Sequence, residues 1–318
     1  MSDGLVHKVT VVIPAYKAER TIVRAIDSVI GQPGCSPSVI VIVDGRLDNT
    51  EDVVRSRYGD KVTLLVNASN CGVQYCRNIG LDLVSDEAVM FLDSDDFIEA
   101  PLLHGLADAL VRNGTDIAFG RMRVFDERKS TFGPITGLVG SEQDIFANWL
   151  AEGKFVGTCS VMWRTQFLRE IGAWDPAFLR QEDGELVLRA LLSGARTARS
   201  EKGCGVYVMH TSPDRLTRRN DHLDCLLRVP AKLLAMNARD FPRTLVQNAC
   251  AKSYYNAART CYTRGARQLG RQALRESRAL GFKGHLGNFV QRLSSALLGL
   301  PASSLLERGL RKVLGKSV

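Results

Sequence analysis

Three carboxylates follow a short apolar segment in the first third of the chain. Residues 89–92 have the length and composition of a buried strand, and Asp93, Asp95 and Asp96 come directly after it. Carboxylates this close repel one another unless a cation or strong hydrogen-bond donors join them. Oxygen ligands suit Mg²⁺ or Mn²⁺, which take further ligands from water and substrate phosphates. Two interpretations are open: a divalent metal site, or a solvated turn, because Asp and Ser favour turns.

The segments around these carboxylates alternate between strand and helix patterns. Apolar, β-branched runs predict strands at 9–13, 39–43, 62–66 and 89–92, and apolar residues at helical spacing predict helices between them. Helix-length connections favour a doubly wound, mostly parallel sheet. Ligands bind outside the carboxyl ends of such strands, so Asp44 and the 93–96 aspartates are expected to meet at one crevice.

Composition and cysteine usage predict a cytoplasmic globular protein. The chain of 318 residues is 45% hydrophobic and 24% charged, and its apolar runs are shorter than a bilayer span. We see no secretory signal at the N-terminus. The eight cysteines contain no Cys-x-x-Cys pair, which is typical of reduced thiols.

Charge divides the sequence into two regions. Residues 229–318 contain 16 Lys and Arg against three acids, whereas the preceding residues are slightly acidic. We therefore predict one domain over 1–228 and a basic helical region over 229–318. The basic residues are not interleaved with aromatic ones, so nucleic acid is not an expected partner.

The last helix of the basic region is predicted to be amphipathic. Two interpretations are open for it: peripheral contact with the inner face of a membrane, or packing on the catalytic domain or a second subunit. Its apolar face is formed by Leu305, Leu306, Leu310, Val313 and Leu314.

Five motifs together resemble the family 2 glycosyltransferases. The resemblance covers about 8–215 and implies a GT-A fold: a Rossmann-like, mostly parallel sheet flanked by helices, here with a C-terminal α-helical extension. It also implies an inverting enzyme that uses a nucleotide-sugar. The matching stretches are residues 11–16, 41–45 with 48–50, 70–73 with 77–81, 91–96, and 171–175 followed by 182–183 and 188–189.

The resemblance implies a nucleotide-sugar half at about 8–120. Its residues line the base and ribose pocket, accept a hydrogen bond from the base, or lie near the phosphates and ribose. They are Pro14, Ala15, Tyr16, Asp44, Arg77, Asp93 and Ser94. The family commonly has acidic and Ser residues where this chain has Val43 and Arg46; Arg46 is interpreted either as a phosphate contact or as a solvated loop residue.

The resemblance also implies a divalent metal, Mn²⁺ or Mg²⁺, on the diphosphate. Asp95 is the expected ligand, Asp96 competes with it, and His210 is either a further ligand or a structural residue. Two interpretations are open for Arg215, Arg218 and Arg219: they hold the diphosphate in a loop that closes over the nucleotide, or they are solvated surface residues.

The acceptor half is expected at about 121–228. Asp183 matches the family's catalytic base, and Glu182 and Glu185 are expected to raise its pKa. Glu182 is also an acceptor-site candidate. Trp163 and Trp174 either stack on an acceptor sugar or belong to the core.

The combined prediction is transfer of a sugar, most simply from a UDP-sugar, to a hydroxyl group of a glycan or lipid-linked saccharide of the cell envelope, as in polysaccharide biosynthesis. The alternatives are a nucleotidyltransferase, and a catalytically inactive glycan-binding or scaffold protein of the same fold. A nucleotidyltransferase would carry a Gly-rich phosphate loop near the N-terminus, and residues 14–17 are not one.

Overall fold

The computed structural model describes residues 7–210, 221–238 and 240–313. The chain forms two compact units. Unit 1 comprises residues up to 142, 155–176 and 195–211, and unit 2 comprises 143–154, 177–194 and the residues from 212 onward. The functional division between residues 228 and 229 stays a prediction.

Unit 1 contains a seven-stranded sheet in the order β10-β6-β9-β4-β1-β2-β3. Strand β9 is antiparallel to both of its neighbours and the other pairs are parallel, which confirms the mostly parallel α/β sheet. The strands are β1 (His7–Ala15), β2 (Cys35–Asp44), β3 (Thr63–Asn67), β4 (Ala88–Phe91), β6 (Ile117–Phe119), β9 (Val161–Arg164) and β10 (Thr197–Arg199).

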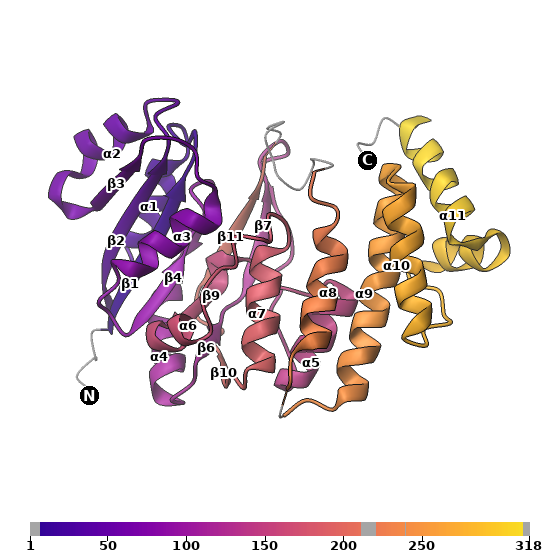
Figure 1. Ribbon diagram of the computed structural model, residues 1–318. Helices are drawn as coiled ribbons and strands as arrows, with labels where there is room; N and C mark the ends of the chain where they lie inside the picture. Colours follow the sequence, from indigo (N-terminus) through magenta and orange to yellow (C-terminus); the bar gives the residue numbers. More distant parts are fainter. Residues whose placement is uncertain (1–6, 211–220, 239, 314–318) are drawn as a thin grey trace. The chain divides into compact units, whose positions relative to one another are not determined.

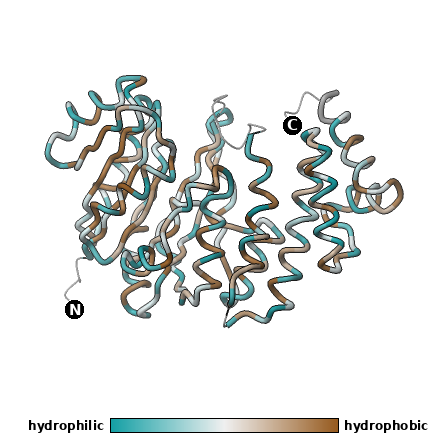
Figure 2. Tube along the Cα trace, in the orientation of Figure 1, coloured by the Kyte–Doolittle hydropathy of each residue, from teal (hydrophilic) through white to brown (hydrophobic). Residues whose placement is uncertain are grey.

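Helices cover this sheet because the connections between parallel strands are helical (Figure 1). The central strands are hydrophobic along most of their length, as expected for strands covered on both faces (Figure 2). The unit 1 helices are α1 (Ile22–Ile30), α2 (Thr50–Tyr58), α3 (Val73–Asp82), α4 (Leu102–Arg112) and α6 (Thr165–Glu170), with short 3₁₀ turns η1 (Gly59–Lys61) and η3 (Thr158–Ser160).

A second sheet of four strands in unit 1 was not predicted as a sheet. Its order is β5-β11-β7-β8, formed by β5 (Phe97–Glu99), β7 (Met122–Asp126), β8 (Thr131–Phe132) and β11 (Cys204–Met209). Within the apolar run 155–163, only the residues of β9 are extended. The Gly157 carbonyl accepts a hydrogen bond from the Ser160 N–H, and this turn interrupts the apolar run.

Helix α3 approaches β1 at a glycine. A Cβ atom at Gly80 would lie 2.3 Å from Cγ1 of Val12, which is fully buried. We expect Gly80→Ala to lower the free energy of unfolding by about 1–3 kcal/mol, because overpacking displaces the helix. Urea unfolding measures this. Gly137→Ala, whose Cβ would be 3.7 Å from Arg121, is the control, and equal losses in both variants would contradict the explanation.

The start of β1 carries a buried histidine. Burial, and then the neighbouring His104, lower the pKa of His7 below its ordinary value of 6.5. Because the folded pKa lies below the unfolded one, His7 favours the folded state above about pH 6.5 and this contribution is lost as the pH falls below it. We expect His7→Gln to lose less thermal stability than the wild type between pH 7.5 and 5.5; equal losses would exclude His7 as the cause.

Unit 2 is helical, which confirms the predicted C-terminal helices. Its helices are α5 (Glu142–Ala147, whose first residue belongs to unit 1), a π-helical turn η2 (Asn148–Glu152), α7 (Glu182–Leu192), α8 (Cys225–Ala235), α9 (Arg243–Arg264), α10 (Arg267–Ala279) and α11 (Phe289–Val313). Helix α9 is central, and its residues Tyr254, Tyr255, Ala258 and Cys261 are buried in the core of the C-terminal helices. Helix α11 bends at Gly299, whose φ of 76° is not helical. None of the described helices is long and apolar enough to span a membrane.

Candidate active site

Asp44, at the end of β2, holds the loop that leads into α3. Its carboxylate is 3% exposed and accepts hydrogen bonds from the Cys71 and Gly72 backbone N–H groups, each at 2.8 Å, and from the Asn67 amide at 3.1 Å. Gly45 is at φ 90°, and a Cβ there would lie 3.2 Å from the Asn70 nitrogen. Asp44 and Gly45 therefore hold the 69–72 loop in place. Base recognition by Asp44 stays a prediction.

Arg77 is buried behind the 93–96 turn. Its side chain is 2% exposed, and Nη2 donates to Oδ1 of Asp93 at 2.7 Å. The guanidinium carbon lies 5.4 Å from the centre of the Trp174 ring. Arg77 therefore positions Asp93, whose side chain remains 32% exposed at the carboxyl edge of the sheet.

Asp95 and His210 come together although 115 residues separate them. His210 Nε2 lies 2.8 Å from Asp95 Oδ2, and the two side chains are 22% and 39% exposed. Burial, and then the Asp93 charge, raise the pKa of Asp95, whereas His210 opposes this shift. The structure thus places His210, the predicted further metal ligand, in contact with Asp95, the expected ligand.

Asp96 faces a different element. Its carboxylate is 2% exposed and accepts a 2.8 Å hydrogen bond from the Val208 backbone N–H in β11. This bond fixes the end of β11, and His210 follows Val208 by two residues. Metal binding by Asp96 stays a prediction, and its contact with β11 favours Asp95 for that role.

The carboxylates and His210 suit a divalent cation that is only partly held by protein. In the described ranges no three His, Cys, Asp or Glu side chains form a complete metal site. Mg²⁺ and Mn²⁺ commonly use one or two carboxylates and take other ligands from substrate phosphates and water. Asp95 and His210 fit that pattern, and the repulsion between Asp93 and Asp95 is what a cation would relieve.

The other residues predicted for the donor site lie around this edge of unit 1. Ala15 is buried at the end of β1, Tyr16 is 42% exposed, and Ser94 is half-buried within the turn. Pro14 is paired in register with Ile42 of β2. Arg46 forms an ion pair with Glu51 at 3.0 Å, which favours its interpretation as a loop residue.

Trp163 and Trp174 lie in the core. They are 3% and 2% exposed. Trp174 packs edge-on against Phe91 at 4.2 Å, and its backbone exchanges two hydrogen bonds with the Asn78 amide. Sugar stacking by either tryptophan gains no support from this burial, and the core interpretation explains both.

Asp183 lies in unit 2, in the first turn of α7 and next to Glu182; both are half-buried. Glu185 is 1% exposed, and Arg189 Nε and Lys232 Nζ lie 2.7 Å and 2.8 Å from its Oε1. These cations compensate the charge that we expected Glu185 to place beside Asp183. They also fix the helix that carries Asp183.

Arg24 was not predicted for the site. Its Nη2 donates to the Asp95 backbone carbonyl at 2.8 Å, and its guanidinium lies 5.1 Å from the Phe97 ring centre. Sequence shows it only as a charged residue within a helix, so no signal marked it. The predicted Arg215, Arg218 and Arg219 lie outside the described residues.

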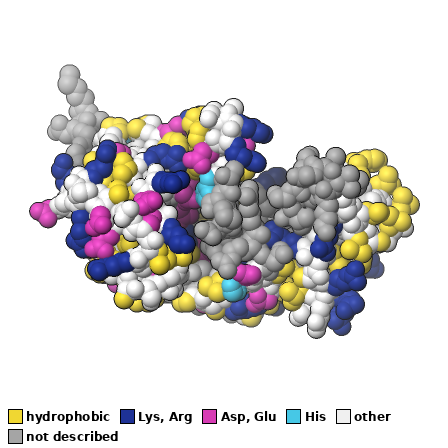
Figure 3. Space-filling model, turned by 90° about the horizontal axis from the view of Figure 1, so that it is seen from above, with side chains coloured by type: hydrophobic (Ala, Val, Ile, Leu, Met, Phe, Trp, Pro, Cys, Tyr) yellow, Lys and Arg dark blue, Asp and Glu magenta, His cyan; other side chains and the backbone are white. Residues whose placement is uncertain are grey.

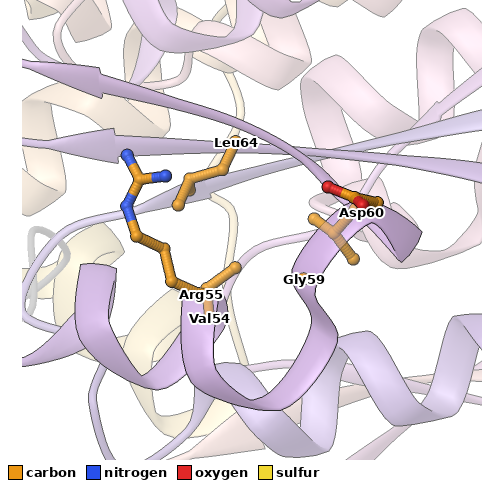
Figure 4. Close-up of a pocket in the computed structure, with 6 residues that line it drawn as sticks. Val54, Arg55, Gly59, Asp60 and Leu64 are labelled. Carbon is orange, nitrogen blue, oxygen red and sulfur yellow. The ribbon is translucent and has the colours of Figure 1, made fainter.

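A separate pocket of about 280 Å³ in unit 1 contains none of the predicted site residues (Figure 4). Its labelled side chains come from α2, the η1 turn and β3, with Arg55 and Asp60 as its charged groups. It lies beside the edge strand β3 and carries no chemistry for the proposed site.

A family model described as "Glycosyl transferase family 2" matches residues 10–172 of the chain. The succinoglycan biosynthesis protein ExoO of Rhizobium meliloti is 29% identical over 249 residues, which cover 74% of this chain and 70% of ExoO. The E. coli UDP-Glc:alpha-D-GlcNAc-diphosphoundecaprenol beta-1,3-glucosyltransferase WfgD is 28% identical over 49% of this chain and 60% of WfgD.

Other similarities are partial or concern the fold. The glycosyltransferase GlyA of Streptococcus pneumoniae is 32% identical over 39% of this chain, which spans only 18% of GlyA. The structure of S. aureus TarS 1–349 in complex with UDP-GlcNAc superposes with a TM-score of 0.67 at 18% identity, over 97% of this chain and 92% of TarS 1–349. This likeness confirms the predicted GT-A fold.

Proposed function

The chain belongs to glycosyl transferase family 2, and from that membership we propose that it transfers a sugar from a nucleotide-sugar to a hydroxyl group of a glycan or lipid-linked saccharide. The observation that carries the proposal is the pairing of Asp95 with His210, beside Asp93 held by Arg77, at the carboxyl edge of the parallel sheet. Ligands of open α/β sheets bind at this edge.

UDP is the proposed nucleotide. WfgD acts on UDP-Glc by its name, and TarS binds UDP-GlcNAc in its complex. The diphosphoundecaprenol-linked acceptor of WfgD supports a lipid-linked or growing saccharide as the acceptor class. Asp44 and Tyr16 are the proposed contacts around the nucleotide, and Arg77 is proposed to act near it by positioning Asp93.

Asp95 and His210 are the residues proposed to hold a divalent metal. When bound, Mn²⁺ or Mg²⁺ would neutralise charge that develops on the departing diphosphate. Arg77 orients Asp93, Arg24 holds the Asp95 carbonyl, and Asp96 anchors β11, so the chain positions the turn before any ligand arrives.

Asp183 is the proposed general base. It removes the proton from the acceptor hydroxyl as that oxygen forms its bond to the anomeric carbon of the donor. The bond between this carbon and the diphosphate oxygen breaks, so nucleoside diphosphate leaves and the anomeric configuration inverts. The pairs of Glu185 with Arg189 and Lys232 keep the supporting helix in place.

A thermal-shift titration with UDP, GDP, CDP and dTDP, each with and without Mn²⁺, tests the donor site. A ligand at 100 times its Kd stabilises the native state by about 2.7 kcal/mol. We expect a metal-dependent rise of the melting temperature with UDP. A rise with another nucleotide would change the donor class, and no rise with any of them would favour the catalytically inactive alternative.

Membership of glycosyl transferase family 2 disfavours the nucleotidyltransferase alternative. A nucleotidyltransferase would release pyrophosphate from a nucleoside triphosphate, whereas a glycosyltransferase releases nucleoside diphosphate. Measuring which product appears, with UDP-sugars and with UTP, separates the two reactions.

A further inference from the structure

The outward side of the first half of α11 is apolar. Phe289, Val290, Leu293 and Leu297 are 71%, 70%, 48% and 74% exposed. Their spacing of one, four and eight residues from Phe289 places them on one side of a helix, opposite the buried Ser295. A soluble surface rarely exposes so many large apolar side chains together unless it contacts a partner.

This apolar side includes a shallow hollow. The hollow has a volume of about 390 Å³ and its lining includes Phe289, Leu293 and Ala296. Arg292 and His285 line it as well. An apolar hollow whose lining includes an arginine matches a ligand that combines acyl chains with an anionic head group.

Helix α10 exposes a row of arginines. Arg267, Arg271 and Arg275 recur every four residues, so they lie on one side of the helix, and all three are exposed. The opposite side, with Gly270, Ala273 and Ser277, is buried. Both α10 and α11 pack on α9. Hydrophobic side chains gather over α11, with a group of Lys and Arg side chains next to them (Figure 3).

We propose that this α10–α11 surface, formed by Phe289, Val290, Leu293 and Leu297 with Arg267, Arg271 and Arg275, binds the surface of an anionic lipid bilayer. Apolar side chains enter the boundary between head groups and acyl chains, and the arginines contact anionic head groups. We place α11 on the surface of the membrane. No helix within the described residues is long and apolar enough to cross it.

Charge distinguishes a bilayer from a second copy of the chain. Residues 267–292 contain six Lys and Arg against one acid, Glu276. Two copies meeting through this surface would bring like charges together, whereas an anionic bilayer complements them. The inference is independent of the donor chemistry, so either can fail without the other.

Vesicle flotation of the full-length protein tests the proposal. We expect it to float with vesicles of phosphatidylcholine containing about 30% phosphatidylglycerol, to bind pure phosphatidylcholine more weakly, and to dissociate as salt rises. Leu297→Glu should weaken binding at least about tenfold, because it removes apolar area that would enter the bilayer and adds a negative charge that anionic head groups repel. Arg271→Ala combined with Arg275→Ala should weaken binding to anionic vesicles more than to neutral ones.

Val139→Glu is the matched control, because Val139 of unit 1 is also 74% exposed. Circular dichroism and melting temperature confirm that each variant is folded. Absence of flotation by the wild type, or equal flotation of Leu297→Glu and the wild type, would overturn the proposal. So would a wild-type dimer in light scattering that Leu297→Glu converts to monomer without changing flotation.

Discussion

We expect Asp183→Asn to reduce the turnover of glycosyl transfer by about 10²–10⁴-fold, the usual contribution of a general base. The amide matches the carboxylate in size but cannot accept the proton of the acceptor hydroxyl. Nucleoside diphosphate should still stabilise the variant in a thermal-shift titration, because Asp183 is not among the residues proposed for the donor site in unit 1. Release of UDP in the presence of donor and acceptor measures the turnover.

Asp52→Asn is the matched control for this variant. Asp52 also lies in the first turn of a helix, α2, and is exposed, so the substitution makes the same chemical change at a helix N-terminus. It should leave turnover unchanged. Wild-type turnover in Asp183→Asn would remove Asp183 as the base, and a loss of nucleotide binding together with turnover would indicate a structural role for it.

The parallel sheet could be predicted because its signals are local. Continuous β-branched runs mark buried strands, and helical spacing between them marks crossovers. Predicted strand 39–43 lies within β2, and the helix predicted between strands 9–13 and 39–43 is α1. The rule for open sheets then predicts that the carboxylates at the ends of two of these strands lie at the same edge of the sheet.

Contacts between distant segments could not be predicted in the same way. In the second sheet, Cys204 of β11 pairs with Glu99 of β5, 105 residues earlier, and Gly205 pairs with Met122 of β7, 83 residues earlier. This pairing brings His210 to Asp95. Its strands are short, and β5 has only three residues, so hydrophobic periodicity has little length in which to appear. The Arg24 contact with Asp95 is equally invisible in sequence.

The structure also gives family motif residues local roles that a motif alone does not reveal. Asp44 caps the backbone N–H groups of Cys71 and Gly72, and Gly80 allows α3 to approach Val12. Trp174 is a core residue that packs against Phe91. A motif can therefore combine residues that touch a ligand with residues that only position them.

The second large effect is expected at the metal site. Asp95→Ala should weaken Mn²⁺-dependent binding of UDP at least about tenfold, because loss of partners around a metal commonly costs 10–100-fold in affinity. Binding measured without metal should change little. Isothermal titration of UDP, with and without Mn²⁺, measures both affinities.

Three further variants show whether the effect belongs to the pair of Asp95 and His210. His210→Ala should weaken the metal-dependent binding in the same direction, because it removes the side chain 2.8 Å from Asp95. Asp96→Ala should lower thermal stability through the lost Val208 contact, and Asp60→Ala, at the separate pocket, should change neither property. If Asp96→Ala abolished metal-dependent binding in a fully stable protein while Asp95→Ala did not, the metal would have to be reassigned to Asp96. Because the Asp96 carboxylate is buried against β11 whereas the Asp95 side chain is only half-buried at the edge of the sheet, we expect the opposite order.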